Sequence, residues 1–537
     1  MGALLLAIDV GSRGTRAGAL DEKGRLVALA ERPIDLLEPG AGQAVYRMDA
    51  VWQAVGEAIR ACLSADPGLG QRIVGLCFDA TQSLVLDHDG PPPLAGEADV
   101  FSWMDRRGDS EAAAMSELGM GDFSADSHLP KLRWLKRHHP DAWARITGTR
   151  CLVDELARRA TGNDRHALAT LATRWPYAPR DPDPWNHAML AAVGLDDVWG
   201  FGALAGDPVP LGQVHGPLLQ DVAAALGLPP GIPVSPGLLD GQAGLLGTIG
   251  RNPAARWETS AALIAGVTAP LLLLSSTARD IPGINGPHAD AVLPGLWFYE
   301  AGQPWSGGAL DHILDTHPGG PHASGAAEHD AAARDILALL DAEGPAFAAT
   351  CHILPGQPGD VALTMGLGTG RPGARSRRGC LETYYAAARG LALQASEGIA
   401  RLKAHGFPIE RVALAGGQAH NPLMQRLYRD ALGADLVVSR HPNPVLLGSA
   451  MMAAVAAGVH PDIMTAIERM SAPQARLVAD PFWHQAHAAA YEIYQHLAAT
   501  RDHAARAAQT LAAPSLTPYG RSPAKAPSRA ASRASHE

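Results

Sequence analysis

The alternation of apolar runs and glycine turns at the start of the chain predicts three strands. Leu4–Ile8 is a continuous apolar run, which is typical of a strand buried on both faces. Gly11–Gly14 predicts a tight turn, after which Thr15–Leu20 and Arg25–Ala30 predict two more strands joined by a polar hairpin. The chain therefore opens with a small sheet.

Helical spacing follows this sheet. Val51, Val55, Ile59 and Cys62 recur on one helical face, and Asp49 is a suitable N-cap for that helix. A longer stretch, Lys131–Arg159, also carries leucines at helical spacing and is predicted to be helical throughout.

Two further strands are predicted to end at polar loops. Ile73–Phe78 leads into Asp79, and Pro233–Leu238 leads into Asp240. Strands that end at polar loops and alternate with helices are typical of α/β proteins, whose ligands bind at the carboxyl ends of strands.

The second half of the chain repeats this layout. Its predicted strands are Ala262–Val267, Arg411–Leu414 and Leu436–Val438, and its predicted helices are Leu381–His405, a helix capped by Asn421 that ends at Gly433, and Leu446–Ala457. We therefore expect two domains, residues 1–250 and 251–500. The stretch His317–His329 is predicted to be a solvated loop. Residues 512–537, rich in Ala, Ser, Pro and Arg, are predicted to be a disordered tail.

Composition narrows the class of protein. The chain has 537 residues, 47% hydrophobic and 18% charged, with a formal net charge of −10, so we expect no nucleic-acid partner. Its five cysteines show no CxxC spacing, which is typical of a reducing compartment. The apolar runs are too short to cross a bilayer. These features predict a cytoplasmic protein with no membrane partner.

Three short motifs carry candidate chemistry, and the first is Ile8-Asp9-Val10-Gly11-Ser12-Arg13-Gly14-Thr15-Arg16. Its glycine turn can offer backbone N–H groups to phosphate oxygens, and Asp9 is a candidate ligand for Mg²⁺. Arg13 or Arg16 could reach a transferred phosphoryl group. The alternative is a plain hairpin.

The second motif is Gly237-Leu-Leu-Asp240-Gly-Gln-Ala-Gly244. A carboxylate at the end of a strand can accept the proton of a hydroxyl group during phosphoryl transfer. The alternative is that Asp240 only caps the helix that follows.

The third motif is Ala415-Gly416-Gly417-Gln-Ala-His-Asn421. Glycines after a strand let the backbone approach a flat ligand such as adenosine. The alternative is a glycine turn that leads into a helix.

Taken in order, these three motifs resemble those of the FGGY carbohydrate kinases. The resemblance runs from about Leu4 to Pro461 and implies an α/β fold of the actin/hexokinase-like (ribonuclease H-like) class, duplicated into two domains with a cleft between them. It also implies ATP and Mg²⁺ as cofactors. Asp240 is then the catalytic base, Asp9 the metal ligand, and the cofactor-binding residues are Asp9, Gly11, Ser12, Arg13, Thr15, Arg16, Thr259, Gly416, Gly417 and Asn421.

Finer matches are similar to the ribulose-kinase branch of this family. They are Gly75-Leu-Cys-Phe-Asp79-Ala-Thr81-Gln82-Ser-Leu-Val, Trp103-Met-Asp105-Arg106-Arg107, Pro130-Lys131-Leu-Arg-Trp134-Leu-Lys136, and Pro294-Gly295-Leu-Trp297-Phe-Tyr-Glu300-Ala-Gly302-Gln303. The resemblance implies a sugar pocket formed by Thr81, Gln82, Asp105, Arg106, Asp240 and Glu300.

The sequence departs from the family pattern at three places. Gln82 stands where the ribulose-kinase branch has cysteine. Trp257-Glu258-Thr259-Ser260 replaces the usual Gly-Thr-Ser loop near the γ-phosphate, and Glu258 there would repel phosphate or bind a metal. After Leu354, the family's Gly-x-Arg-x-Pro loop is absent, and Pro355-Gly-Gln-Pro-Gly359 and the arginine-rich stretch Arg371 to Arg378 stand there instead. Two alternatives stay open for these arginines, substitution for that loop and solvated surface charge.

The predicted function is transfer of the γ-phosphoryl group of ATP to a hydroxyl of a pentulose, with D-ribulose favoured. The alternatives are a kinase for L-ribulose or for a pentitol such as ribitol or xylitol, and a catalytically weak sensor of sugar and nucleotide. The predicted partner is a small sugar or polyol. The oligomeric state is open, with a homodimer as one alternative.

Overall fold

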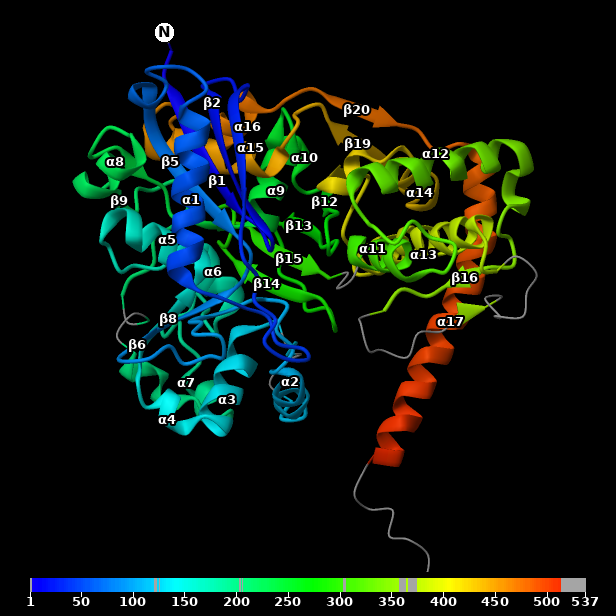
Figure 1. The fold of residues 1–537 in the computed structure, drawn as a ribbon, viewed down its shortest axis with the longest axis horizontal. Coiled ribbons are helices and arrows are strands. Elements are labelled where there is room, and N and C mark those ends of the chain that lie inside the picture. Colours follow the sequence, from blue (N-terminus) through cyan, green and yellow to red (C-terminus); the bar gives the residue numbers. More distant parts are fainter. Residues whose placement is uncertain are drawn as a thin grey trace, which may run out of the picture.

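A computed structural model describes residues 2–119, 123–124, 126–201, 204, 206–302, 306–356, 364–365 and 374–512. The predicted tail from 513 onward lies outside the described residues, as do Gln303 and most of the segment between Leu354 and Arg375. Two large sheets with helices around them form the body (Figure 1).

The first sheet belongs to the first half of the chain. Its strand order is β3-β2-β1-β5-β10-β9, with β11 also paired to β5. The central strand β1 is fully buried and pairs in parallel with β5, in agreement with its continuous apolar sequence. The strands are β1 (Leu4–Val10), β2 (Gly14–Asp21), β3 (Leu26–Pro33), β5 (Ile73–Ala80), β9 (Gly216–Pro217), β10 (Pro233–Val234) and β11 (Leu238–Leu239).

A smaller sheet with strand order β4-β7-β6-β8 extends the first half. Its strands are β4 (Val45–Tyr46), β6 (Leu84–His88), β7 (Val100–Phe101) and β8 (Ile146–Cys151). The helices of the first half are α1 (Met48–Leu63), α2 (Asp109–Ser116), α3 (His128–His138), α4 (Pro140–Trp143), α5 (Leu152–Thr161), α6 (Leu168–Arg174), α7 (His187–Ala192), α8 (Gln220–Leu226) and α9 (Asp240–Ile249).

The second sheet comes from the second half, with strand order β14-β15-β13-β12-β18-β19-β20. The strands are β12 (Ser260–Ile264), β13 (Leu271–Ser275), β14 (Asn285–Ala289), β15 (Trp297–Ala301), β18 (Arg411–Ala415), β19 (Asp435–Ser439) and β20 (Gln474–Leu477). A two-stranded ribbon joins β16 (His352–Ile353) to β17 (Thr364–Met365). The helices are α10 (Pro253–Arg256), α11 (Gly307–Thr316), α12 (Ala326–Glu343), α13 (Arg377–Ala404), α14 (Pro422–Ala431), α15 (Pro444–Ala456), α16 (Ile463–Met470) and α17 (Pro481–Ala512).

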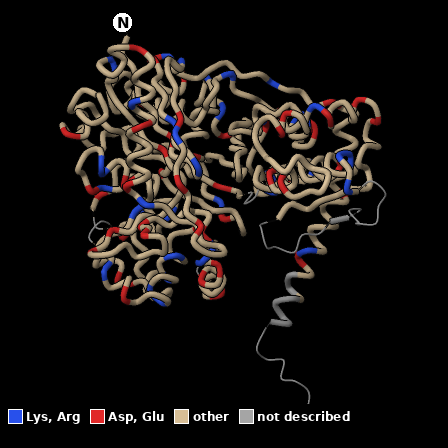
Figure 2. The backbone as a smooth tube through the Cα atoms, viewed as in Figure 1, with Lys and Arg blue, Asp and Glu red and all other residues tan. Residues whose placement is uncertain are grey.

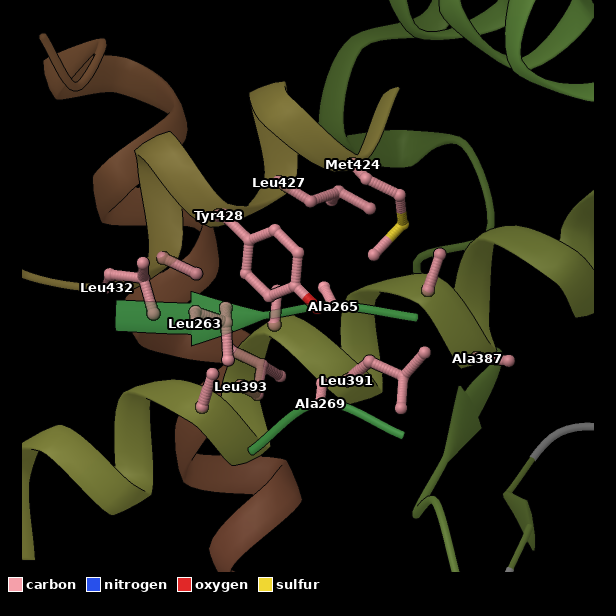
Figure 3. Close-up of a cluster of buried hydrophobic side chains, with 14 of the residues drawn as sticks. Leu263, Ala265, Ala269, Ala387, Leu391, Leu393, Met424, Leu427, Tyr428 and Leu432 are labelled. Carbon is pink, nitrogen blue, oxygen red and sulfur yellow. The ribbon is translucent and has the colours of Figure 1, made fainter. Parts of the chain in front are cut away.

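One face of the second sheet packs on α13 and α14. Leu263 of β12 meets Leu391 and Leu393 of α13 and Tyr428 of α14 in a single apolar cluster (Figure 3). The helix α17 lies against this group and projects from the body at its far end (Figure 1). Lysine, arginine and acidic residues are interspersed over both halves (Figure 2).

The helices α9 and α15 join the two halves. Their buried side chains share one core with Leu5 and Cys77 of the first sheet and with Ala262 and Leu272 of the second. The helix α15 belongs to the second half of the chain, yet it packs on β1 and β5 of the first sheet. The domain boundary near residue 250 stays a prediction, and the hydrophobic core is continuous across it.

Most of the predicted elements are present, with local corrections. The stretch Lys131–Arg159 is not one helical region, because Ile146–Cys151 forms a strand that pairs with β6. Its β-branched residues Ile146, Thr147 and Thr149 favour this. The predicted strand Pro233–Leu238 is broken into β10 and β11, since Pro236 lacks the N–H group that a continuous ladder needs.

Two boundary residues also differ from the prediction. Asp49 lies in the first turn of α1, whose N-cap is Arg47, and the carboxylate of Asp99 accepts the N–H of Met48 at 2.8 Å. The predicted loop His317–His329 ends early, because α12 begins at Ala326. By contrast, Asn421 caps α14 as predicted, accepting hydrogen bonds from the N–H groups of Leu423 and Met424.

All five cysteines are buried. A search of the described residues found no helix with the length and apolarity needed to cross a membrane.

The contact between α9 and α15 generates a stability prediction. A Cβ added at Gly448 would lie 1.9 Å from the carbonyl oxygen of Ala243, so the two backbones must move apart. Gly448→Ala should lower the free energy of unfolding by about 1–3 kcal/mol or more, measured by denaturant titration. The matched control is Gly398→Ala in α13, where the nearest atom would be a leucine methyl at 3.7 Å. Equal stability of the two variants would contradict the close-packing argument.

Candidate active site

Three carboxylates meet at the carboxyl ends of the first sheet. Asp9 on β1 lies opposite Asp79 on β5 in the parallel register, and Leu238 of β11 also pairs with Asp79. Asp240 follows two residues after Leu238. Side chains alternate along a strand, so Asp9 points to the same face as Leu5 and Ala7, which pack toward α9 and α15. The three acids therefore gather where the first sheet faces the second half of the chain.

Asp240 has the electrostatic setting of a general base. Burial raises the pKa of Asp240 to about 7, and the negative charge of Asp9 adds to the shift. The N–H of Gly241 donates to its Oδ1 at 2.7 Å and works in the opposite direction. A carboxylate with a pKa near neutrality is both available and basic enough to accept a hydroxyl proton.

Asp79 is the most buried of the three acids, with an exposed fraction of 0%. Burial raises its pKa well above the ordinary value, and the charge of Asp9 raises it further. Ser449 on α15 donates a hydrogen bond to Asp79 Oδ2 at 2.6 Å. The second half of the chain thus reaches into the acidic cluster of the first.

Asp9 has one cationic partner in this cluster. Arg16 on β2 donates to Asp9 Oδ2 at 2.9 Å and also pairs with Glu31. The described residues contain no group of three side chains arranged to hold a metal by themselves. Asp9, at the carboxyl end of β1, is the kind of group that holds Mg²⁺ in proteins, where one or two carboxylates act together with water and substrate phosphates.

The turn between β1 and β2 lies directly beyond Asp9. It is closed by a hydrogen bond from Gly11 N to Gly14 O at 2.9 Å. Ser12 Oγ accepts from the indole N–H of Trp103 at 2.8 Å, and Thr15 is buried with its Oγ1 lacking a hydrogen-bond partner in the described part of the chain. The guanidinium of Arg13 is exposed and lies 3.5 Å from Glu38, so Arg13 is not held at the acidic cluster.

A second group of polar side chains extends from Asp240 toward the predicted sugar pocket. Glu300 on β15 accepts a hydrogen bond from Arg174 of α6 at 2.8 Å. The charge of Glu300 raises the pKa of Asp240, and the charge of Arg174 lowers it. Gln82 donates through Nε2 to Asp126. Gln82 Oε1 and Arg174 Nε are buried and lack hydrogen-bond partners among the residues that the structure describes. Unpaired buried polar atoms are costly unless a ligand or water satisfies them, so this cluster is suited to a hydroxylated ligand.

Thr81, Asp105 and Arg106 are placed differently from one another. Thr81 Oγ1 lies 3.0 Å from Ser83 Oγ beside this group. Asp105 is fully buried, and both of its oxygens accept from Arg107 while Oδ2 also accepts from Ala44 N. Arg106 is exposed and pairs with Asp109. Asp105 and Arg106 thus have ion-pair partners among the described residues, and their assignment to sugar hydroxyls stays a prediction.

The glycine turn after β18 forms the candidate nucleotide side. Gly416 has a φ of 85°, and a Cβ there would lie 2.5 Å from Ala265 O, so this position requires glycine. Gly417 has open space on its Cβ side, where a flat ligand can approach the backbone. The side-chain oxygen of Asn421 accepts hydrogen bonds from Leu423 N and Met424 N at the start of α14. Asn421 therefore holds the glycine turn against this helix.

Thr259 does not lie with Gly416. Strands β12 and β18 are parallel, and Thr259 precedes β12 while Gly416 follows β18. Thr259 O accepts a hydrogen bond from Glu410 N at 2.9 Å, and Glu410 directly precedes β18. Thr259 therefore lies at the amino-terminal ends of these strands, whereas Gly416 lies at their carboxyl ends. The loop beside Gly416 is Gly266–Thr268, which is joined to α11 by the hydrogen bond from Gly307 N to Gly266 O. This corrects the assignment of Thr259 to the phosphates.

The same register accounts for Glu258. Its carboxylate accepts from Ser276 N at 3.1 Å and from the hydroxyls of Ser275 and Ser276 at 3.3 Å. Glu258 therefore lies before the amino-terminal end of β12, bound to the end of β13, and not beside the glycine turn after β18.

Sequence reasoning placed Asp79 in the segment similar to the ribulose kinases without giving it a role of its own. It missed Asp126, Arg174 and the loop Gly266–Thr268 as candidates for the site. Asp79 carried a usable signal, because it ends a buried strand next to the strand of Asp9. Arg174 and Asp126 carried none, since neither stands at a predicted strand end. The loop Gly266–Thr268 could have been predicted from the sequence, because it follows the apolar run of β12 in the same way as Gly416 follows β18.

Comparison with known proteins defines the class. The model of the N-terminal domain of the FGGY family of carbohydrate kinases matches residues 4–247, and the model of the C-terminal domain matches residues 261–457. The chain belongs to this family and is a sugar kinase. Membership also implies ATP as the phosphoryl donor.

Individual relatives agree with the predicted branch. The chain is 30% identical over 513 residues to an FGGY carbohydrate kinase domain-containing protein of Xenopus laevis, covering 87% of this chain and 91% of that protein. It is 24% identical over 511 residues to a D-ribulokinase of Saccharomyces cerevisiae, covering 84% and 71%. The predicted resemblance to ribulose kinases is thereby confirmed.

Solved structures confirm the predicted fold class. A xylulose kinase of Rhodospirillum rubrum superposes with a TM-score of 0.68 at 22% identity, over 93% of this chain and 98% of that chain. A glycerol kinase of Plasmodium falciparum, solved with ADP, gives 0.68 at 13% identity over 92% and 98%. At these identities the likeness shows the two-domain α/β fold and no more.

The ion pair between Arg174 and Glu300 generates a prediction about the sugar. Arg174→Met should raise the KM for sugar at least about tenfold, because it removes the cationic partner of Glu300 and leaves that carboxylate only the long hydrogen bond from Asn285 at 3.4 Å. Nucleotide affinity should change little. The control is Arg180→Met, which breaks a second arginine pair between the halves, with Asp290 at 2.8 Å. Neither of these two residues is among the main causes of the pKa shift of Asp240. A similar sugar KM in both variants would show that the pair only joins the halves.

Proposed function

We propose that this kinase transfers the γ-phosphoryl group of ATP to a hydroxyl of a pentulose, with D-ribulose as the favoured substrate. The observation that carries the proposal is Asp240, a carboxylate with a pKa of about 7 beside Asp9 at the end of the first sheet. The choice of sugar is supported by the segment Asp79–Ser83 and by the yeast D-ribulokinase relative.

In the proposed reaction, Asp240 accepts the proton of the attacking hydroxyl. The oxygen of that hydroxyl forms a bond to the γ-phosphorus, and the bond between this phosphorus and the β,γ-bridging oxygen of ATP breaks to release ADP. Arg174, Glu300 and the Gln82–Asp126 pair orient the sugar so that the hydroxyl faces Asp240. Orientation of this kind supplies a large part of the rate acceleration in phosphoryl transfer.

The nucleotide lies across both halves in this proposal. Gly416 and Gly417 bind the adenosine side, and the turns Gly11–Thr15 and Gly266–Thr268 hold the phosphates. Asp9 would hold Mg²⁺, which neutralises phosphate charge when bound, and Arg16 keeps the Asp9 carboxylate in place.

The alternatives differ in substrate. L-ribulose, ribitol and xylitol present the same kind of hydroxyl to Asp240 and stay open as acceptors. The hypothesis of a sensor without turnover depended on Glu258 and on the segment after Leu354. Glu258 lies away from the site, and residues 357–363 and 366–373 of that segment lie outside the described residues. A homodimer remains a proposal, which light scattering would test.

The proposed substrate is tested by ADP release over a panel of D-ribulose, L-ribulose, D-xylulose, ribitol and xylitol. We expect the highest kcat/KM for D-ribulose, by at least about tenfold over the pentitols. A buried polar group of the site that loses its partner on the sugar costs on the order of 1–3 kcal/mol. A pentitol with the highest kcat/KM would overturn the choice of a ketose while leaving the kinase assignment intact.

The role of Asp240 generates the second test. Asp240→Asn should lower kcat about 10²–10⁴-fold while nucleotide affinity is nearly retained. In the parent, kcat/KM for sugar should rise about tenfold per pH unit below pH 7 and level off above it, because only deprotonated Asp240 accepts the proton. The variant should lack this limb. Asp221→Asn, an exposed change on α8, is the control. Parental turnover in Asp240→Asn would exclude Asp240 as the base.

A further inference from the structure

Trp103 connects the phosphate turn with the sugar side of the site. Its indole N–H donates to Ser12 Oγ at 2.8 Å. Its backbone N–H donates to Ser83 Oγ at 3.3 Å, and its carbonyl accepts from Lys131 Nζ at 3.3 Å. One residue therefore contacts three segments that are far apart in the sequence.

The bond to Ser12 has a defined direction. An indole N–H can only donate, so Ser12 Oγ is the acceptor, and its own hydrogen stays available for another acceptor. The backbone of Ser12 is fixed separately, because the hydroxyl of buried Tyr46 donates to Ser12 O at 2.8 Å. The indole therefore controls the side chain of Ser12, while Tyr46 holds the turn itself.

We propose that Trp103 is a positioning residue for phosphoryl transfer: its indole N–H orients the hydroxyl of Ser12 so that the hydroxyl donates to a phosphate oxygen of ATP. The inference depends on the proposed function, since Ser12 meets a phosphate only if the nucleotide lies at this turn.

The surroundings of Trp103 support this role. Lys131 is fully buried and donates to Asp126 O at 3.2 Å as well as to Trp103. Asp126 in turn accepts from Gln82 of the proposed sugar group. Because the backbone of Trp103 is held from the sugar side, the indole reaches the phosphate turn from a fixed base. A buried indole N–H needs an acceptor in any role. What supports a functional role is that the acceptor here is a side chain of the predicted phosphate turn.

A competing interpretation makes the opposite kinetic prediction. An aromatic ring in a sugar pocket can pack against the sugar itself, and its loss would then raise the KM for sugar. If Trp103 acts through Ser12, its loss affects the KM for Mg·ATP instead. Substituting phenylalanine separates the two, because it keeps a flat ring and removes the N–H donor.

The experiment compares Trp103→Phe, Ser12→Ala and the double variant. Trp103→Phe should raise the KM for Mg·ATP about 2–12-fold, the value of one neutral hydrogen bond, with the sugar KM within about twofold of the parent. The double variant should match Ser12→Ala alone, because the indole acts only through that hydroxyl.

Trp143→Phe is the matched control. Its indole N–H also donates a hydrogen bond, to Asp197 at 2.9 Å, in the same half of the chain and away from the acidic cluster. We expect this variant to change the melting temperature without changing either KM.

Direct titration of ATP into the parent and into each folded variant separates failure of nucleotide binding from failure of the proposed role of Trp103. A parent that binds no nucleotide would overturn the proposed function and this inference with it. With nucleotide binding intact in the parent, an unchanged KM for Mg·ATP in Trp103→Phe, an effect on the sugar KM alone, or losses that add to those of Ser12→Ala would each overturn the inference alone.

Discussion

The close contact of α9 with α15 is the constraint on which both sheets depend. At Gly247 and Gly448 the two helix backbones approach so closely that an added Cβ would lie 1.9 Å from the opposite carbonyl oxygen. Gly75 of β5 is similarly close to α15, with a Cβ position 2.9 Å from Ala453 O. Each sheet buries one face against this helix pair, so neither half of the chain has a complete core without the other.

The same packing produces the chemistry of the acidic cluster. Asp9 and Asp79 stand at the ends of two adjacent buried strands, where little water remains to solvate their charges. Burial and the negative charge of Asp9 then raise the pKa values of Asp79 and Asp240. Ser449 and Arg16 stabilise the cluster from opposite sides, one from α15 and one from β2. The proposed base thus owes its pKa to the fold that surrounds it.

The sequence was sufficient for features that depend on local pattern. The apolar run of β1, the cap at Asn421 and the ordered glycine motifs predicted the layout of both halves, and the motifs led to the family. What the sequence could not provide is pairing. The segment Ile146–Cys151 is a strand because it pairs with β6. The position of Thr259 is set by the parallel pairing of β12 with β18.

The contacts of the proposed sugar side could not be predicted from the sequence either. Arg174 meets Glu300 across 126 residues of sequence, and Ser449 meets Asp79 across 370. Such pairs are set by the packing of the two halves and leave no trace in local spacing. The residues that pattern did identify are those at strand ends, because the ends of parallel strands have a fixed relation to the sheet.

The position of Asp240 on α9 has a mechanical consequence. Asp240 is the first residue of this helix, and Gly247 lies about 10 Å further along it at 1.5 Å per residue. The proposed base and the helix crossing therefore belong to one stiff rod. If the halves rotate about that crossing, Asp240 sits on a short lever arm and moves little, whereas groups farther from the crossing travel farther. A substitution at the crossing would then tilt the rod and shift the carboxylate, so that damage to packing would also appear in the rate of the reaction.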